Sequence, residues 1–178
     1  MKLALIGFKS VGKTTIAQAI AHLHGLNYID TDHLIEKQYV AMHQQTLTTA
    51  DIFKTHGETY FRNLEKNIIS TISNGSPHQI LATGGGAVLD PENIFHLKKY
   101  HTLVYLETSF ELLHQRIKNQ TMPSFLSPDN VEQDLKNLYQ KRKFLYEEAA
   151  DIIINVTNKS VSEISKEISQ LMTGTIHG

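Results

Sequence analysis

The sequence predicts a three-layer α/β sandwich, in which helices cover both faces of a parallel β-sheet. Two observations support this fold class. Short apolar runs alternate with longer segments of helical periodicity, and the runs are apolar on both faces, as in a buried parallel sheet. The 178 residues are expected to form one domain without a linker. The predicted strands lie at 2–7, 27–30, 79–83, 102–108 and 151–156.

Helical patterns fill the intervals between most of these strands. A capping-box-like Thr48-Thr49-Ala50-Asp51 precedes the third pattern, and Gly57 is expected to interrupt it. Residues 119–130 contain Pro123 and Pro128 and indicate a mobile loop. The helices are predicted at 13–24, about 31–42, about 52–73, about 110–118, 131–149 and 161–172.

The loop after the first strand matches the phosphate-binding pattern G-x-x-x-x-G-K-[ST] at Gly7, Gly12, Lys13 and Thr14. Glycines let successive backbone N–H groups converge on phosphate oxygens, and the helix that follows adds its positive dipole end. The lysine reaches the β- and γ-phosphates, while the threonine hydroxyl coordinates Mg²⁺. The sequence therefore predicts that Ser10, Val11, Gly12, Lys13, Thr14 and Thr15 bind the phosphates of MgATP.

Carboxylates and glycines follow the second and third strands. Asp30 and Asp32 lie where the second strand ends, and ligands of open α/β sheets bind beyond the carboxyl ends of strands. One carboxylate could hold Mg²⁺ through water and the other could accept a proton, although either could instead cap the next helix. Three consecutive glycines, Gly84 to Gly86, would let backbone N–H groups approach a ligand closely.

Composition argues against several other classes of protein. The net charge is -1 and the pI is about 6.8, so we expect no nucleic-acid partner and no anionic membrane partner. Without cysteine there is no disulfide framework and no thiol catalysis. The apolar runs are too short to span a membrane or to form a signal peptide. We therefore expect a cytoplasmic protein, and we assign it separately as a monomer.

Taken together, these segments resemble shikimate kinases, which are P-loop small-molecule kinases. The resemblance covers nearly the whole chain, in the strings GFKSVGKTT, YIDTD, ADIFKTHGETYFRNLE, LATGGGAV and YQKRKFLYEEAAD. It implies a five-stranded parallel sheet in the order 2-3-1-4-5, with a substrate-binding region near 32–65 and a lid near 113–127. It also implies transfer of the ATP γ-phosphate to the 3-hydroxyl of shikimate, with Mg²⁺ as cofactor.

The resemblance also implies residue roles. Asp32 matches the catalytic base, Lys13 the phosphate lysine, and Asp30 the residue that supports Mg²⁺ together with Thr14. On the acceptor side, Arg62 and Arg142 match two arginines that bind the shikimate carboxylate, which suits the planar guanidinium group. The remaining matches are Glu65 as the residue that orients Arg62, Gly84 and Gly85 as backbone contacts to substrate, and Lys159 beside adenine.

One departure from the family lies in the lid, where Met122 stands in place of an arginine that touches the ATP phosphates. Arg116 or Lys118 could supply the missing cation, Lys13 and Mg²⁺ could suffice at a lower rate, or turnover could be poor. We favour the first explanation and assign Arg116 to the ATP site. A lesser departure is Ser10, where the family usually has glycine.

Three other functions fit part of the pattern. Another small P-loop kinase, acting on gluconate or a nucleoside monophosphate, would share the loop and the sheet. A GTPase is suggested by TNKS at 157–160, but Ser160 and Val161 cannot accept the guanine N–H groups as aspartate does. A shikimate-binding protein that turns over slowly, or not at all, is the third alternative.

Overall fold

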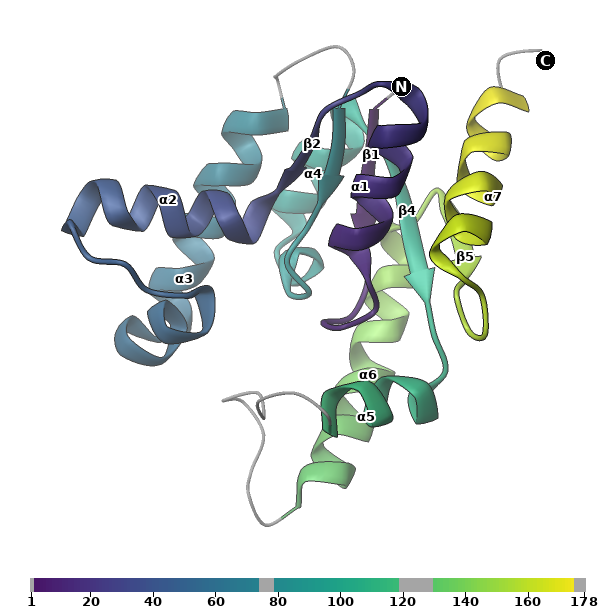
Figure 1. Cartoon of the computed structure of the whole chain (residues 1–178). Coiled ribbons are helices and arrows are strands. Elements are labelled where there is room, and N and C mark those ends of the chain that lie inside the picture. Colours follow the sequence, from purple (N-terminus) through teal and green to yellow (C-terminus); the bar gives the residue numbers. More distant parts are fainter. Residues whose placement is uncertain (1, 74–78, 119–129, 175–178) are drawn as a thin grey trace.

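The computed structural model describes residues 2–73, 79–118 and 130–174 and contains one five-stranded parallel sheet (Figure 1). The order of the strands is β2-β3-β1-β4-β5, so the fold class and the strand order expected from the family resemblance are both confirmed. The strands are β1 (Lys2–Ile6), β2 (Tyr28–Asp30), β3 (Gln79–Ala82), β4 (Thr102–Glu107) and β5 (Ile152–Asn155).

Seven α-helices and one short 3-10 helix occupy the described residues. The 3-10 helix is η1 (Ala87–Leu89), and the α-helices are α1 (Lys13–His24), α2 (Thr31–His43), α3 (Thr49–Ser73), α4 (Pro91–Tyr100), α5 (Phe110–Lys118), α6 (Val131–Ala149) and α7 (Val161–Gly174). Helix α3 begins three residues earlier than predicted, because Thr48 already caps it: the Asp51 N–H donates to the Thr48 hydroxyl over 3.2 Å. The expected interruption at Gly57 is confirmed by its non-helical φ of 82°.

Helix α4 was missed by the sequence analysis, which passed directly from the glycine triplet to the fourth strand. The Asp90 side chain caps its N-terminus by accepting the Glu92 N–H over 2.9 Å, and Pro91 occupies the first helical position. Aspartate followed by proline is a helix-start signal, so the sequence did contain the information.

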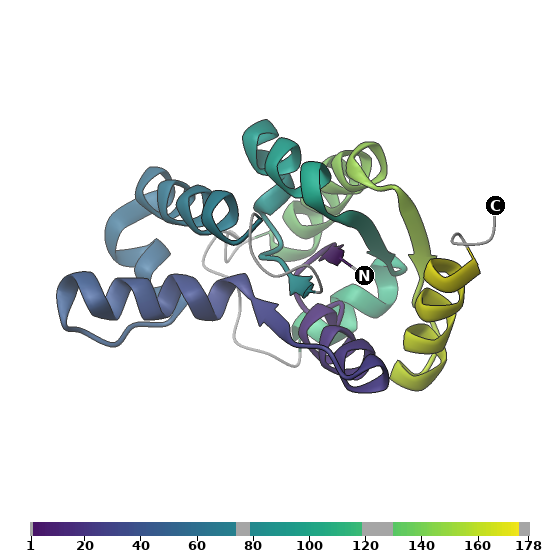
Figure 2. The ribbon, with the colours of Figure 1, turned by 90° about the horizontal axis from the view of Figure 1, so that it is seen from above.

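The two faces of the sheet bury separate hydrophobic cores. In β1 the side chains alternate: Leu3 and Leu5 pack toward α1 and α7, whereas Ala4 and Ile6 pack toward α4, α5 and α6. Figure 2 shows α1 and α7 together on one side of the sheet, so the sandwich has the three predicted layers.

A third, smaller core joins α2 to α3, which extend from the sheet beyond β2 (Figure 1). Ile35, Tyr39 and Ile52 are fully or almost fully buried there, and Phe61 and Leu64 pack with them. The helix pair thus has apolar packing of its own while it remains attached to the strand that carries Asp30. None of the described helices has the length and hydropathy needed to cross a membrane.

Candidate active site

The phosphate-binding loop joins β1 to α1 with an uncapped helix N-terminus. Gly12 takes the N-cap position in a left-handed conformation, with φ of 103°, and among the described residues no side chain caps the N-terminus of α1. The N–H groups of its first turn and the positive end of the helix dipole form an anion site. Ser10 also has a positive φ, 68°, in the left-handed region that favours glycine.

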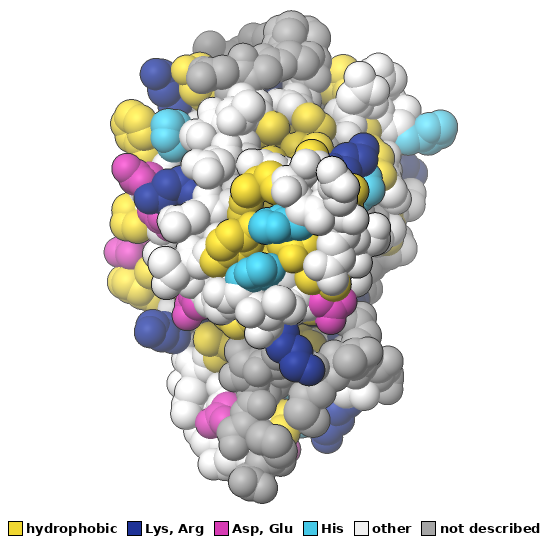
Figure 3. Space-filling model, turned by 90° about the vertical axis from the view of Figure 1, so that its left-hand side faces the viewer, with side chains coloured by type: hydrophobic (Ala, Val, Ile, Leu, Met, Phe, Trp, Pro, Cys, Tyr) yellow, Lys and Arg dark blue, Asp and Glu magenta, His cyan; other side chains and the backbone are white. Residues whose placement is uncertain are grey.

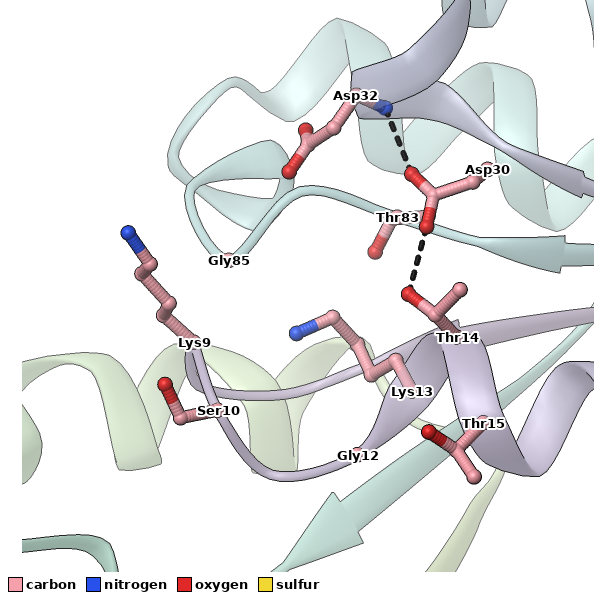
Figure 4. Close-up of a pocket in the computed structure, with 10 residues that line it drawn as sticks. All are labelled: Lys9, Ser10, Gly12, Lys13, Thr14, Thr15, Asp30, Asp32, Thr83 and Gly85. Atoms are coloured by element: carbon pink, nitrogen blue, oxygen red, sulfur yellow. Dashed lines mark hydrogen bonds between the residues drawn. The ribbon is translucent and has the colours of Figure 1, made fainter. Parts of the chain in front are cut away.

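A cavity of about 220 Å³ opens over this loop (Figure 4). It brings together most of the residues predicted to bind the ATP phosphates and Mg²⁺, both aspartates, and one residue of the glycine triplet. Its lining is Lys9, Ser10, Gly12, Lys13, Thr14, Thr15, Asp30, Asp32, Thr83 and Gly85. The segments come from the carboxyl ends of β1, β2 and β3, where a ligand site was expected.

Lys13 points into the cavity from the start of α1 and is only 8% exposed. Its ammonium donates to the carbonyl oxygens of Gly7 and Phe8, each over 2.8 Å. Burial lowers its pKa to about 8, although Asp32 and Asp30 act in the opposite direction. A bound polyphosphate would favour the charged form of Lys13, so the pKa of this lysine is expected to rise when an anion binds.

Thr14 and Asp30 form an oxygen pair beside Lys13. The Thr14 hydroxyl donates to Asp30 Oδ2 over 2.6 Å, and Asp30 Oδ1 accepts the Asp32 N–H over 2.9 Å. Asp30 therefore also caps α2, so the capping alternative holds for this residue alongside its place in the cavity. Hydroxyl and carboxylate oxygens are the ligands that Mg²⁺ prefers, so the pair fits that ion.

Asp32 lies opposite the phosphate loop, near the buried Glu65. Burial raises the pKa of Asp32, and the nearby charge of Asp30 adds to this effect. Burial also raises the pKa of Glu65, which is fully inaccessible to solvent. A Cβ on Gly84 would come within 2.8 Å of both Asp32 Oδ1 and Glu65 Oε1, so this position requires glycine if the two carboxyl groups are to approach the loop.

The two predicted carboxylate-binding arginines converge on the glycine triplet. Arg62 donates to Glu65 Oε2 over 2.6 Å and packs against Gly86. Arg142 hydrogen-bonds the Tyr146 hydroxyl, which in turn donates to the Gly85 carbonyl oxygen over 2.5 Å. Neither arginine belongs to the lining of the 220 Å³ cavity, but both lie beside the loop that does.

The other predicted ATP residues lie in three different situations. Arg116 Nη1 donates to the Val11 carbonyl oxygen over 3.1 Å and so touches the phosphate loop, while the Val11 side chain itself is buried in the core. Lys159 pairs with Glu167 over 2.6 Å and does not line the cavity. Lys118 is exposed. The part of the predicted lid that follows it, residues 119–127 with Met122, lies outside the described residues.

Sequence reasoning missed three residues of this region. Lys9 and Thr83 line the cavity, and Tyr146 links Arg142 to Gly85. Lys9 occupies a variable position of the phosphate-loop pattern, which gives no signal for its direction. Thr83 was assigned to a strand end, and Tyr146 reaches the site only through the tertiary fold.

A 2-3-1-4-5 parallel sheet, with a glycine–lysine–threonine loop facing two aspartates, defines a P-loop kinase. A family model described as shikimate kinase matches residues 9–173. The chain belongs to the shikimate kinase family.

Individual relatives agree with this membership. A shikimate kinase from Caldanaerobacter subterraneus is 34% identical over 93% of this chain and 92% of its own length, and one from Dehalococcoides mccartyi is 36% identical over 93% and 90%. Among solved structures, shikimate kinase from Acinetobacter baumannii in complex with shikimate superposes with a TM-score of 0.86. It is 32% identical and covers 99% of this chain and 94% of its own.

Proposed function

We propose that the chain transfers the γ-phosphoryl group of ATP to the 3-hydroxyl of shikimate, a step of chorismate and aromatic amino acid biosynthesis. Membership of the shikimate kinase family supports this activity. The observation that carries it is one cavity in which a phosphate lysine faces an aspartate at the end of a neighbouring strand. Two arginines lie beside the same cavity, where an acidic acceptor needs them.

The ATP phosphates are proposed to bind the N–H groups of residues 10–15 and the Lys13 ammonium. Arg116 is proposed to lie near them, since it already contacts the loop backbone. Thr14 and Asp30 would hold Mg²⁺, which supplies charge neutralisation on the phosphates when bound. Lys159 stays a weaker proposal for adenine, because its ammonium is paired with Glu167.

The acceptor is proposed to bind between α3 and the glycine triplet, within the region near 32–65. Arg62 and Arg142 would pair with its carboxylate, and the backbone of Gly84 and Gly85 would contact its ring. Glu65 would hold Arg62 in place through the 2.6 Å ion pair. A bidentate guanidinium–carboxylate pair is both stronger and more directional than a neutral hydrogen bond.

Asp32 is proposed to accept the hydroxyl proton as the new P–O bond forms. The raised pKa of its carboxyl group, caused first by burial, makes the ionised form a stronger base. The rest of the catalysis is positioning and charge neutralisation. Because the proposed substrates are soluble metabolites, we expect a cytoplasmic, single-domain enzyme, and we propose that it acts as a monomer.

A coupled assay of ADP release would test this function with shikimate, quinate and gluconate as acceptors. We expect turnover with shikimate, little with the other two, and none in Lys13→Ala, whose circular dichroism should match that of the wild type. Turnover with gluconate alone would support another small-molecule kinase. Tight binding of shikimate and ATP without ADP release would support a binding protein instead.

A further inference from the structure

The proposed transfer leaves one charged residue of the cavity without a role. Among the ten lining residues the cations are Lys13 and Lys9. Lys13 is held by two loop carbonyl oxygens, whereas the ammonium of Lys9 has no hydrogen bond or ion pair with the described part of the chain. Figure 4 shows the two side chains on different sides of the cavity, with Asp32 across from them.

The backbone places Lys9 between the phosphate side and the acceptor side. Its amide nitrogen lies 3.0 Å from the position that a Cβ on Gly85 would take, so the phosphate loop and the glycine triplet are in direct contact there. The Lys9 side chain therefore starts where the two halves of the site meet. An ammonium on a flexible stem of this length can reach a group that lies between ATP and the acceptor.

Electrostatics agree with this placement. The charge of Lys9 lowers the pKa of Lys13 and also lowers that of Asp32, although burial is the larger influence on both. Lys9 thus acts on the phosphate lysine and on the proposed base at the same time.

We propose that the Lys9 ammonium binds the transferring phosphoryl group of the substrate and stabilises it in the transition state. This inference rests on the proposed kinase activity. The bond between the γ-phosphorus and the β,γ-bridging oxygen breaks, and a bond from phosphorus to the acceptor oxygen forms. The hydroxyl proton passes to Asp32, and Lys9 stays protonated throughout. Cations at the equatorial oxygens lower the barrier of such a transfer.

The alternative for an exposed lysine near phosphates is general attraction of ATP. That role would change the KM for ATP and leave kcat nearly unchanged, because the interaction would be equal in the ground state and the transition state. A contact with the transferring group acts mainly on kcat. Steady-state kinetics can therefore separate the two roles.

We would compare Lys9→Met, Lys9→Arg and the control Lys166→Met, which removes an exposed charge on α7, outside the proposed site. Lys9→Met should lower kcat about 10- to 100-fold with both KM values within about threefold. Lys9→Arg should retain most of the activity and Lys166→Met all of it. Unchanged kcat in Lys9→Met beside an active wild type would overturn the role of Lys9 alone. A wild type without any transfer would overturn the kinase proposal and this inference together.

A binding measurement gives a readout besides turnover. Aluminium fluoride with MgADP and shikimate mimics the transferring phosphoryl group, and its complex can be followed by calorimetry. Lys9→Met should weaken this complex at least tenfold more than it weakens MgADP alone. Equal weakening of the two complexes would overturn the proposal.

Discussion

At the level of single residues, burial shifts the pKa values of three charged groups of the site in the absence of ligands. The pKa of Lys13 is lowered to about 8, while those of Asp32 and Glu65 are raised, in each case first by loss of solvent. A triphosphate beside Lys13 and a guanidinium beside Glu65 act against these shifts. Ligand binding and the ionisation of the site are therefore coupled, as expected where buried groups gain a partner of opposite charge.

Arg62 offers a test of the acceptor side. Arg62→Ala should raise the KM for shikimate about 10- to 100-fold and leave the KM for ATP within about threefold, because the lost contact is a charge-assisted pair with the acceptor carboxylate. Initial-rate kinetics with each substrate varied in turn would measure both constants.

The control for this variant addresses the charge left behind. Without Arg62, Glu65 becomes a buried carboxyl group that has lost its 2.6 Å partner, which can also destabilise the fold. Arg62→Lys keeps a cation near Glu65 and removes the planar fork, so its KM should lie between those of the wild type and Arg62→Ala. An equal rise in both KM values would contradict the carboxylate role.

At the level of elements, α2 and α3 are held together by stacked rings on both sides of the break at Gly57. His43 stacks on Tyr39 and on His56, with ring centroids 4.4 and 5.7 Å apart, and His56 stacks on Tyr60 at 4.5 Å. Tyr39 hydrogen-bonds His56 over 2.8 Å, and Tyr60 hydrogen-bonds His43 over 2.7 Å. Figure 3, which views the molecule from the α2–α3 side, shows histidines among hydrophobic side chains.

The break itself can be tested by Gly57→Ala. Gly57 has φ 82° and ψ 174°, a region that is almost restricted to glycine, and a Cβ there would meet no atom within 4 Å. The expected loss of unfolding free energy, about 1–3 kcal/mol, therefore comes from backbone strain alone. Urea denaturation followed by circular dichroism would measure it.

Gly25→Ala is a matched control for this substitution. Gly25 also has open space around a Cβ, but its φ of 62° and ψ of 34° lie in the left-handed helical region, which other residues enter at lower cost. A loss at Gly57 no greater than the loss at Gly25 would show that the break does not depend on glycine.

The elements also show how far the sequence could be read. Short apolar runs located all five strands within one or two residues, because the central strands are buried on both faces and the partly exposed edge strands β2 and β5 are still mostly apolar. Helix α4 was missed although Asp90 and Pro91 mark its start. Of the site, motif spacing predicted Lys13, Thr14, Asp30 and Asp32 in one cavity, whereas the place of Lys9 in its lining depends on the tertiary contact between the phosphate loop and Gly85 and has no local signal.

At the level of the whole molecule, the hydrophobic pattern did not predict the order of the strands, which came from the family resemblance. A short apolar run indicates a buried strand but does not show which strand it pairs with. Here β1 pairs with β3 and β4, both distant in sequence. A buried imidazole lies beside the same sheet, outside the site. His101 follows α4, is 4% exposed, and has no hydrogen-bond partner for either ring nitrogen among the described residues.

This histidine makes the stability of the whole fold depend on pH. Burial lowers the pKa of His101 from the ordinary 6.5 to about 4; the Leu97 backbone opposes this shift, and the charge of Lys2 adds to it. Between these values the unfolded chain binds a proton that the folded chain does not, so stability is full above pH 6.5 and falls as the pH drops toward 4. From pH 7 to pH 5 the contribution is about 2 kcal/mol. The variant His101→Phe, which cannot be protonated, should lose correspondingly less stability over this interval than the wild type.

Because the carboxyl groups of the site titrate equally in both proteins, the difference between their urea midpoints at the two pH values isolates His101. Parallel decreases in the two proteins would mean that the folded chain accommodates a charged imidazole at this position.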